Sequence, residues 1–393
     1  MSAKQQVFIF SSVHPWNDTR IFHKQARSLA EAGYDVHVYA IVSETTYDHT
    51  IPNITVQTFH KADLLGRRKI WKQFRDIIKK HQPDYVHLHD PELMLLIRRI
   101  KRISNASVLF DMHENFPAAL ASKKIAGRPF PKSVIPFVRH VEQQMLQKAD
   151  AVLFAEESYK QYYRNIPAKK MDILNYPHQN KACNNLSKPS RPLIIYAGAI
   201  HEVRGFDEML ATAKELRDRG HQFELIIIGK IPDRLEDKAQ CYVKQNKLAN
   251  HVQLLGRMDL QHVNNYYARA TIGLALLHPE PNYLGSIATK IFEYMSFGLP
   301  FVASNFPLWQ EFVTTSGSGL TANPKSVMNI ANQIEILLTN DEKRRELSRN
   351  GKIAHNQKYN WTYEAQKLLS LYDDLKGGQG YENSLHPSTL PTK

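Results

Sequence analysis

The stretch VFIFSSVHPWNDTRIFHKQARSLAEAGYDVHVYAI (Val7–Ile41) decides the fold class of this chain. It opens with an apolar run, Val7–Ser12, that is typical of a buried strand. A helical pattern follows over Arg20–Ala32, and Gly33 stands where that helix would end. A second apolar run, Val36–Ile41, completes a strand–helix–strand unit, which favours parallel strands.

The same alternation recurs in both halves of the 393 residues. In the first half we expect strands at Ile54–Thr58, Tyr85–Leu88, Val108–Phe110 and Ala151–Ala155, and a helix over Arg67–His81. A proline-containing, aperiodic segment, Asn175–Pro192, reads as a linker. Beyond it we expect strands at Leu193–Tyr196, Phe223–Ile228, Val252–Leu255, Ile272–Leu276 and Phe301–Ala303, and helices at Gly205–Arg219, Lys325–Leu338, Asp341–Gln357 and Thr362–Lys376. The pattern predicts an α/β protein of two doubly wound, Rossmann-like domains with their strand ends around a central cleft.

Composition excludes several classes of protein. With 42% apolar and 23% charged residues the chain is globular, and its two cysteines cannot form a disulfide framework. The start, MSAKQQVFIFSS, lacks the apolar stretch of a signal peptide, and Leu93–Ile97 is far shorter than the roughly 18–20 residues that span a bilayer. We therefore expect a cytoplasmic protein.

Positive charge is concentrated in the first half. The net charge is +13, of which residues 1–180 carry +9. Such an excess is typical of a polyanionic partner, either nucleic acid or an anionic membrane, although a solvated basic surface is the plainer explanation.

Two segments of the second half carry phosphate-binding chemistry. In EPNYLGSIATKIFEYMSFGLPFVAS (Glu280–Ser304) a helix is expected to open at Gly285-Ser286, and its free N–H groups suit a phosphate. Lys290 and Glu293 are three residues apart, so they could serve a diphosphate and a ribose, or form a surface ion pair. In YAGAIHEVRGF, Gly198 ends a strand and Arg204 begins the next helix, where a guanidinium can hold a phosphate.

In order and spacing these segments resemble the retaining glycosyltransferases of family 4, which have the GT-B fold. The resemblance extends to VHPWNDTRIFHKQARSLAEAGYDVHV, PDYVHLHDPEL and VLFDMHENFP in the first half, and to KYNW before the last helix. It implies an acceptor-binding domain over residues 1–178, a donor-binding domain over residues 190–359, and a last helix, residues 360–376, that returns to the first domain. Residues 377–393 are expected to be a disordered tail.

The resemblance also implies roles for individual donor-site residues. Arg204 matches the cation that binds the diphosphate, and Glu293 matches the second glutamate of the E-x7-E motif, which holds the ribose. The chain departs from that motif at Gly285, which stands where the family has the first glutamate. In the family that glutamate contacts the donor sugar, so the identity of the sugar stays open. Ala199 replaces an arginine, whose charge Lys290 would supply. The remaining expected donor contacts are Gly198, Arg257, Asn282, Ser286 and Ile287.

His113 matches the family's histidine near the donor sugar, and it is the expected catalytic residue. Without the resemblance, a core or capping histidine would be the plainer explanation. The expected acceptor contacts are Ser12, His14, Asp18, Arg20, Asp90 and Glu114, with a helix cap and a salt bridge as the alternative for Asp18 and Arg20.

No Asp-x-Asp triplet occurs, so a metal-independent mechanism without cofactor is expected, with Arg204 and Lys290 offsetting the charge of the leaving diphosphate. The predicted function is retaining transfer of a sugar from a nucleoside-diphosphate sugar, with UDP as the expected nucleotide, to a glycan or lipid-linked acceptor in surface-polysaccharide biosynthesis. The basic segments ELMLLIRRIKRI (Glu92–Ile103) and Ala118–Val141 suggest peripheral attachment to an anionic membrane, unless Leu93–Ile97 is a buried helix face.

Three other functions remain open from the sequence. A GT-B-like sugar-nucleotide epimerase would turn over donor without acceptor. A metallohydrolase would use His87 and His89, with His113 and Asp111, as metal ligands. A non-enzymatic nucleic-acid-binding protein would use the basic clusters, although no nucleic-acid-binding motif accompanies them.

Overall fold

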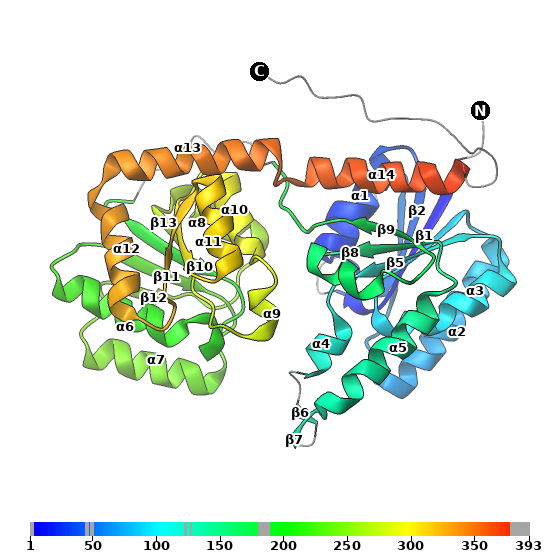
Figure 1. Cartoon of the computed structure of the whole chain (residues 1–393), viewed down its shortest axis with the longest axis horizontal. Coiled ribbons are helices and arrows are strands. Elements are labelled where there is room, and N and C mark those ends of the chain that lie inside the picture. Colours follow the sequence, from blue (N-terminus) through cyan, green and yellow to red (C-terminus); the bar gives the residue numbers. More distant parts are fainter. Residues whose placement is uncertain are drawn as a thin grey trace. The chain divides into compact units, whose positions relative to one another are not determined.

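The computed structural model describes residues 4–43, 47, 51–121, 124–125, 128–179 and 189–377. It divides into two units (Figure 1). The first comprises the chain up to Leu174 and from Glu364 onward, and the second is Asn175–Tyr363. The sequence placed these boundaries near residues 178–190 and 360. Residues 180–188 of the expected linker and 378–393 of the expected tail lie outside the described residues.

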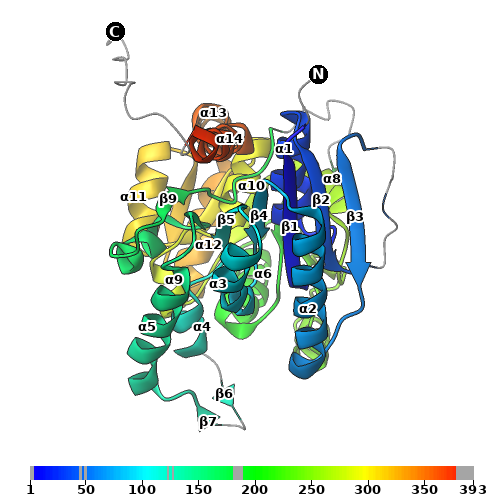
Figure 2. The ribbon, with the colours of Figure 1, turned by 90° about the vertical axis from the view of Figure 1, so that its right-hand side faces the viewer.

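A parallel seven-stranded sheet forms the centre of the first unit, in the order β3-β2-β1-β4-β5-β8-β9. Its strands are β1 (Gln6–Pro15), β2 (Asp35–Ile41), β3 (Ile54–Phe59), β4 (Tyr85–Leu88), β5 (Ser107–Met112), β8 (Ala151–Phe154) and β9 (Lys169–Asp172). Figure 2 shows β1, β2 and β3 in this order toward one edge. The strands expected from the sequence are all present, and β9, which has two lysines and no apolar run, was not predicted.

Helices connect these strands and cover the sheet. They are α1 (Arg27–Glu31), α2 (Leu64–His81), α3 (Ile97–Ile103), α4 (Phe116–Ala121), α5 (Ile135–Leu146) and, from Glu364, α14 (Trp361–Gly377). Short 3-10 turns occupy Pro91–Leu96, Lys132–Val134 and Glu157–Tyr163, and β6 (Lys124–Ile125) pairs antiparallel with β7 (Arg128–Pro129). The helix expected at Arg20–Ala32 instead begins as a π-helix, Thr19–Ala26, and only its last part is α-helical.

The last helix, α14, packs on the first unit as expected from the sequence. Lys367 Nζ donates to the carbonyl of Asp172 (2.7 Å), and the Tyr85 hydroxyl donates to the carbonyl of Tyr372 (3.1 Å). Tyr372 is fully buried. These contacts anchor α14 to β9 and β4 of the first sheet.

The second unit has a parallel six-stranded sheet in the order β12-β11-β10-β13-β14-β15. Its strands are β10 (Leu193–Ala197), β11 (Glu224–Ile228), β12 (Val252–Leu254), β13 (Ile272–Ala275), β14 (Phe301–Ser304) and β15 (Gly319–Ala322). The helices are α6 (Phe206–Asp218), α7 (Asp233–Gln245), α8 (Leu260–Arg269), α9 (Pro281–Leu284), α10 (Thr289–Phe297), α11 (Pro307–Ser316), α12 (Val327–Thr339) and α13 (Asp341–Gln357).

Both faces of the second sheet are buried. Ile194 and Tyr196 of β10 belong to one apolar cluster, whereas Leu193 and Ile195 belong to the cluster on the opposite face. A strand covered on both faces needs apolar residues at every position, and for this reason the strand could be predicted from the sequence. Within the described part of the chain, no helix combines the length and the apolar character needed to cross a membrane.

Each sheet reverses its winding direction once, between β1 and β4 in the first unit and between β10 and β13 in the second. In open α/β sheets, ligands bind beyond the carboxyl ends of the strands at such a switch point. The polar groups collected at these two places are therefore the candidate sites.

Candidate functional site

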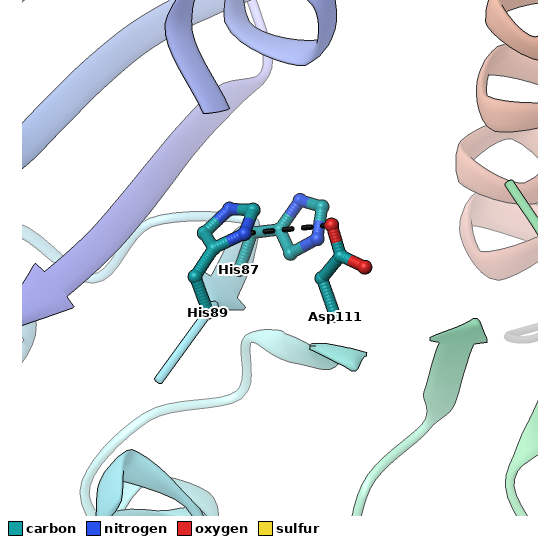
Figure 3. A group of neighbouring side chains, drawn as sticks. All are labelled: His87, His89 and Asp111. Carbon is teal, nitrogen blue, oxygen red and sulfur yellow. Dashed lines mark ion pairs between the residues drawn. The ribbon is translucent and has the colours of Figure 1, made fainter. Parts of the chain in front are cut away.

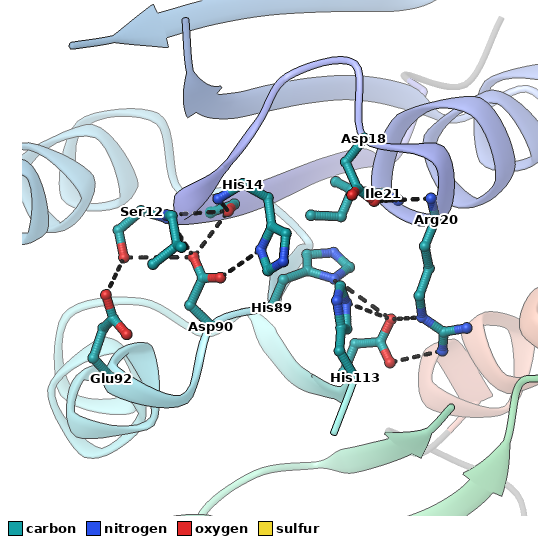
Figure 4. Close-up of polar contacts among 12 residues, drawn as sticks. Ser12, His14, Asp18, Arg20, Ile21, His89, Asp90, Glu92 and His113 are labelled. Atoms are coloured by element: carbon teal, nitrogen blue, oxygen red, sulfur yellow. Dashed lines mark hydrogen bonds and ion pairs between the residues drawn. The ribbon is translucent and has the colours of Figure 1, made fainter. Parts of the chain in front are cut away.

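A break in the pairing of β1 shapes the first site. The register between β1 and β2 shifts between Phe10 and Pro15, so the chain from Ser11 to His14 leaves the regular ladder. This segment wraps around Asp90, which follows β4. Ser11 Oγ donates to Asp90 Oδ2 (2.8 Å), as does the backbone N–H of Val13 (3.0 Å) (Figure 4).

His14 is held by the same carboxylate. Its Nδ1 lies 2.7 Å from Asp90 Oδ1. Burial disfavours the imidazolium, but the hydrogen bond and the charge of Asp90 outweigh it and raise the pKa of His14. Asp90 orients His14 through this hydrogen bond. Because Asp90 is itself fully buried, it has no exposed surface that could contact a ligand. Ser12 lies behind it, with its hydroxyl 3.0 Å from Glu92.

Asp18 forms a helix cap and Arg20 forms a salt bridge, which are the contacts given above as the alternative to acceptor binding. Asp18 Oδ1 accepts from the backbone N–H of Arg20 (2.8 Å) and of Ile21 (3.0 Å), so it caps the π-helix. The Arg20 guanidinium is buried and donates to both oxygens of Asp111 at 2.8 Å. Burial opposes ionisation of Asp111, but the charge of Arg20 dominates and holds the pKa of Asp111 well below its usual range.

A pocket of about 260 Å³ opens in front of this network, entirely within the first unit. His113, which follows β5, lines it together with His14 and Glu114. The other lining residues are His89, Pro91, Phe110, Met112, Phe116 and Glu142. The pocket thus brings together three of the residues expected from the sequence, whereas Ser12, Asp90, Asp18 and Arg20 are not among its lining residues. It combines apolar and aromatic surface with groups able to bind hydroxyls.

Glu142 was not predicted as a site residue. It comes from α5, where no motif distinguishes it, and it is almost fully buried. The Tyr163 hydroxyl donates to its carboxylate. Burial, opposed by that hydrogen bond and by Arg139, raises the pKa of Glu142 to about 7. The charge of the pocket therefore changes near neutral pH.

The side chains that the sequence suggested as metal ligands lie together, but their carboxylate already accepts hydrogen bonds from other residues. Ligand atoms of His87, His89 and Asp111 fall within 4.8 Å of one another (Figure 3). Asp111 Oδ2 also accepts from the Nε of Arg20 and, at 2.6 Å, from Gln25. A cation here would compete with a buried guanidinium for the same carboxylate, so the donor set fits an ion-paired carboxylate better than a metal centre.

The second site lies at the ends of β10 and β13. Gly198 ends β10 with a φ of +146°, and a Cβ there would lie 3.2 Å from Lys290 Nζ. Gly205 has a φ of +74°, and its Cβ would lie 2.2 Å from the carbonyl oxygen of Leu276. The positive φ favours glycine at both positions, and at Gly205 the backbone of Leu276 also leaves no room for a side chain. The chain can therefore turn tightly between β10 and α6.

Lys290 is the unusual group of this site. It is 6% exposed, its Nζ lies 3.4 Å from the centre of the Tyr196 ring, and it has no hydrogen-bond partner among the described residues. Burial, reinforced by the charge of Arg204, puts the pKa of Lys290 well below its usual value. No ion pair joins it to Glu293 within the described part of the chain. Instead the Tyr267 hydroxyl donates to Glu293 Oε2 (3.1 Å). Tyr267 was not predicted, because a tyrosine in α8 belongs to no recognisable pattern.

The helix that carries Lys290 and Glu293 begins later than expected. α10 starts at Thr289, and Gly285 precedes it in a separate turn after α9. The carbonyl of Ser286 accepts from Trp309 Nε1 (2.7 Å), and Ile287 packs on the core. Nothing lies within 4 Å of a Cβ added to Gly285. Arg204 lies 5.5 Å from the Tyr283 ring centre, Arg257 is exposed after β12, and the side chain of Asn282 lies outside the described residues.

Comparison with known proteins identifies the class. Residues 19–176 match the family described as Glycosyl transferase 4-like domain, and residues 179–354 match Glycosyl transferases group 1. The chain belongs to this glycosyltransferase family and has the GT-B fold. It is a glycosyltransferase, and members of the family use nucleotide-sugar donors.

Individual relatives are distant. The alpha-D-kanosaminyltransferase of Streptomyces kanamyceticus is 22% identical over 63% of this chain and 66% of that enzyme, just under two thirds of its length. The lipopolysaccharide 1,2-N-acetylglucosaminetransferase of Salmonella typhimurium is 22% identical over 79% of this chain and 78% of that enzyme. Among solved structures, Anabaena Alr3699/HepE in complex with UDP-glucose has a TM-score of 0.69, with 14% identity over 95% of this chain and all of that one.

Proposed function

We propose that the chain transfers a sugar from UDP to a glycan or lipid-linked acceptor in cell-surface polysaccharide biosynthesis, with retention of configuration and without a metal ion. The observation that carries the proposal is the buried amino group of Lys290, which lies against Gly198 and Tyr196 and has no hydrogen-bond partner among the described residues. A buried polar group without a partner is costly, and a diphosphate at the glycine-lined end of β10 would supply its partner.

The nucleotide part of the donor would be held by groups of the second unit. Arg204 and Lys290 would bind the diphosphate and offset the charge that develops on it as the glycosidic bond breaks. Glu293, oriented by Tyr267, would accept hydrogen bonds from the ribose hydroxyls. Gly198, Arg257, Asn282, Ser286 and Ile287 are the remaining proposed contacts. The uridine base is proposed because the structural neighbour quoted above binds UDP-glucose.

The acceptor would bind in the pocket of the first unit. His14 and Glu114 would contact acceptor hydroxyls, Ser12 and Asp90 would support His14, and Asp18 and Arg20 would fix the π-helix beside them. His113 is the proposed catalytic residue, and its role would be to bond an oxygen of the sugar that is transferred. The apolar part of the pocket suits a sugar face, and the lipopolysaccharide activity of a relative supports a glycan acceptor.

A cytoplasmic protein with a peripheral membrane contact completes the proposal. Leu93, Met94 and Leu96 are buried in the core and Leu95 is 50% exposed, so this part of the basic segment offers a single apolar side chain to a bilayer. The segment around α5 is the better candidate, because Phe137 is 67% exposed beside the exposed Lys132. Less of the Phe137→Ser variant than of the unaltered chain should co-sediment with anionic vesicles. Equal binding of the two proteins would contradict the proposed membrane contact.

A donor screen tests the proposed activity. UDP-, GDP- and ADP-sugars are compared by thermal shift and by nucleotide release, in the presence of EDTA and with glycan or lipid-linked acceptors. We expect a UDP-sugar to give both signals, and the product's anomeric coupling in NMR to match that of the donor. Donor turnover without acceptor and with an altered sugar would instead identify an epimerase. Activity that EDTA abolishes would overturn the metal-free mechanism.

A further inference from the structure

A row of buried ring nitrogens ends at His113. His113 Nε2 lies 2.9 Å from His89 Nδ1, and both atoms face Asp111 Oδ2, at 3.5 Å and 3.4 Å (Figures 3 and 4). Behind them, the His87 ring stacks on His89 with centroids 4.5 Å apart, and His87 Nδ1 lies 2.9 Å from the Tyr372 hydroxyl. His113 itself is partly exposed to the pocket, with 19% of its side chain accessible.

Asp111 is an anchored anion that accepts hydrogen bonds. Arg20 and Gln25 hold its two oxygens from the far side. These contacts keep the carboxylate ionised, as the direction of its pKa shift also indicates. An ionised carboxylate has no proton to give, so any bond between Asp111 and the two imidazoles must use an N–H of a histidine.

His89 has one proton, and the surroundings decide where it resides. The residue is fully buried, and burial lowers the pKa of His89, so its ring is neutral with a single N–H. A proton on Nε2 would be a buried N–H without an acceptor, because that atom has no partner among the described residues. A proton on Nδ1 instead faces both Asp111 Oδ2 and His113 Nε2. Orphaned buried N–H groups are rarer and costlier than an unused lone pair, which favours Nδ1–H.

The tautomer of His89 then determines that of His113. If His89 presents an N–H across the 2.9 Å contact, His113 Nε2 must be the acceptor and cannot carry a proton. A doubly protonated His113 would set two N–H groups against each other at this distance. The one proton of His113 therefore resides on Nδ1, the ring nitrogen for which no described residue provides a partner.

We propose that His89 and Asp111 are positioning residues that fix His113 as the Nδ1–H tautomer, making it a hydrogen-bond donor to an oxygen of the ligand in the pocket. His113 thus does not act as a general base. The tautomer follows from the contacts within the first unit, whereas the role of its N–H toward a sugar rests on the proposed function. Which nitrogen carries the proton is accessible to direct measurement.

Nitrogen NMR of the full-length chain tests the tautomer without any assay of activity. The protein is labelled with ¹⁵N-histidine, and two-bond proton–nitrogen correlations distinguish the two neutral tautomers from the cation. The spectra of His113→Asn and His89→Asn assign the two rings. We expect both rings to be neutral with the proton on Nδ1 at pH 7.5. A proton on Nε2 of His113, or a cationic His113, would overturn the proposal.

Kinetics of His89 variants test whether this positioning serves catalysis. In His89→Asn the side-chain amide can place an N–H near the position of Nδ1, whereas His89→Leu removes it. We expect kcat to fall by the order of tenfold to a hundredfold in His89→Leu, as for other histidine-supporting contacts, and to recover in part in His89→Asn. The Kd for UDP should stay within about twofold in both.

The two tests separate the possible failures. Equal kcat in the two His89 variants, with both still folded by circular dichroism, would contradict the positioning role. Asp111 is left unchanged because its loss would leave the buried Arg20 unpaired and threaten folding. If no donor is turned over by the unaltered chain, the proposed function fails, but the NMR result still decides the tautomer.

Discussion

Glu142 makes a quantitative prediction about pH and stability. Its pKa rises from 4.5 to about 7 on folding, chiefly through burial. Between these two values the folded chain holds a proton that the unfolded chain has released. The free energy of unfolding therefore falls as the pH rises through this range, which is the opposite of the usual behaviour of a carboxyl group.

The magnitude follows from the two pKa values. Linkage gives a loss of about 2.5 kcal/mol in the free energy of unfolding between pH 5 and pH 8 from this one group. The Glu142→Gln variant lacks the titration but keeps an oxygen that can accept from the Tyr163 hydroxyl. Relative to the unaltered chain, the variant should therefore gain stability by that amount over the same pH range.

Urea unfolding followed by tryptophan fluorescence measures the effect. The unaltered chain, Glu142→Gln and the control Glu157→Gln, an exposed residue of the same unit, are compared at pH 5, 6.5 and 8. The difference between Glu142→Gln and the unaltered chain should grow steadily with pH, and the control should show no such trend. A difference that stays within about 0.5 kcal/mol from pH 5 to pH 8 would refute the reasoning, because it would mean that Glu142 is ionised throughout this range.

The remaining predictions concern the two sites. Lys290→Met should raise the thermal midpoint, since it removes a buried amino group that has no hydrogen-bond partner among the described residues, and should weaken UDP binding in titration calorimetry; a lower midpoint or an unchanged affinity for UDP would contradict this. Gly205→Ala should destabilise the second unit by about 1–3 kcal/mol in urea unfolding, because of its positive φ and the clash with Leu276, and a neutral effect would disprove that constraint. His113→Ala should lower kcat by about 10²-fold while UDP binding is preserved, and an unchanged kcat would exclude its catalytic role.

Much of the fold could be predicted from the sequence, because most of its parallel strands are buried on both faces and therefore appear as apolar runs. β4 and α13 have the bounds expected from the sequence. β9 (KKMD) and β15 (GLTA) were not predicted, because short strands at a sheet edge or with small residues lack a continuous apolar run. The π-helix at Thr19–Ala26 could not be foreseen, because its hydrophobic pattern reads equally well as an α-helix.

The sites were only partly predictable, for a similar reason. Motifs that are continuous in the sequence indicated His113, after β5, and Lys290 and Glu293, within α10. The partners that orient these residues come from distant elements. His89 meets His113 from the strand alongside, and Tyr267 reaches Glu293 from α8. Contacts of this kind are set by tertiary packing, and a single sequence holds no local signal for them.

Donor binding by the second unit is the central claim, and titration calorimetry with UDP tests it most directly. The unaltered chain, Glu293→Ala and the exposed control Glu311→Ala are titrated under identical conditions. Loss of two hydrogen bonds from ribose hydroxyls to a carboxylate should cost about 3 kcal/mol, which corresponds to a loss of affinity on the order of 10²-fold in Glu293→Ala. The control should bind like the unaltered chain. Equal affinity in Glu293→Ala, or no binding of UDP by the unaltered chain, would contradict the assignment of this site.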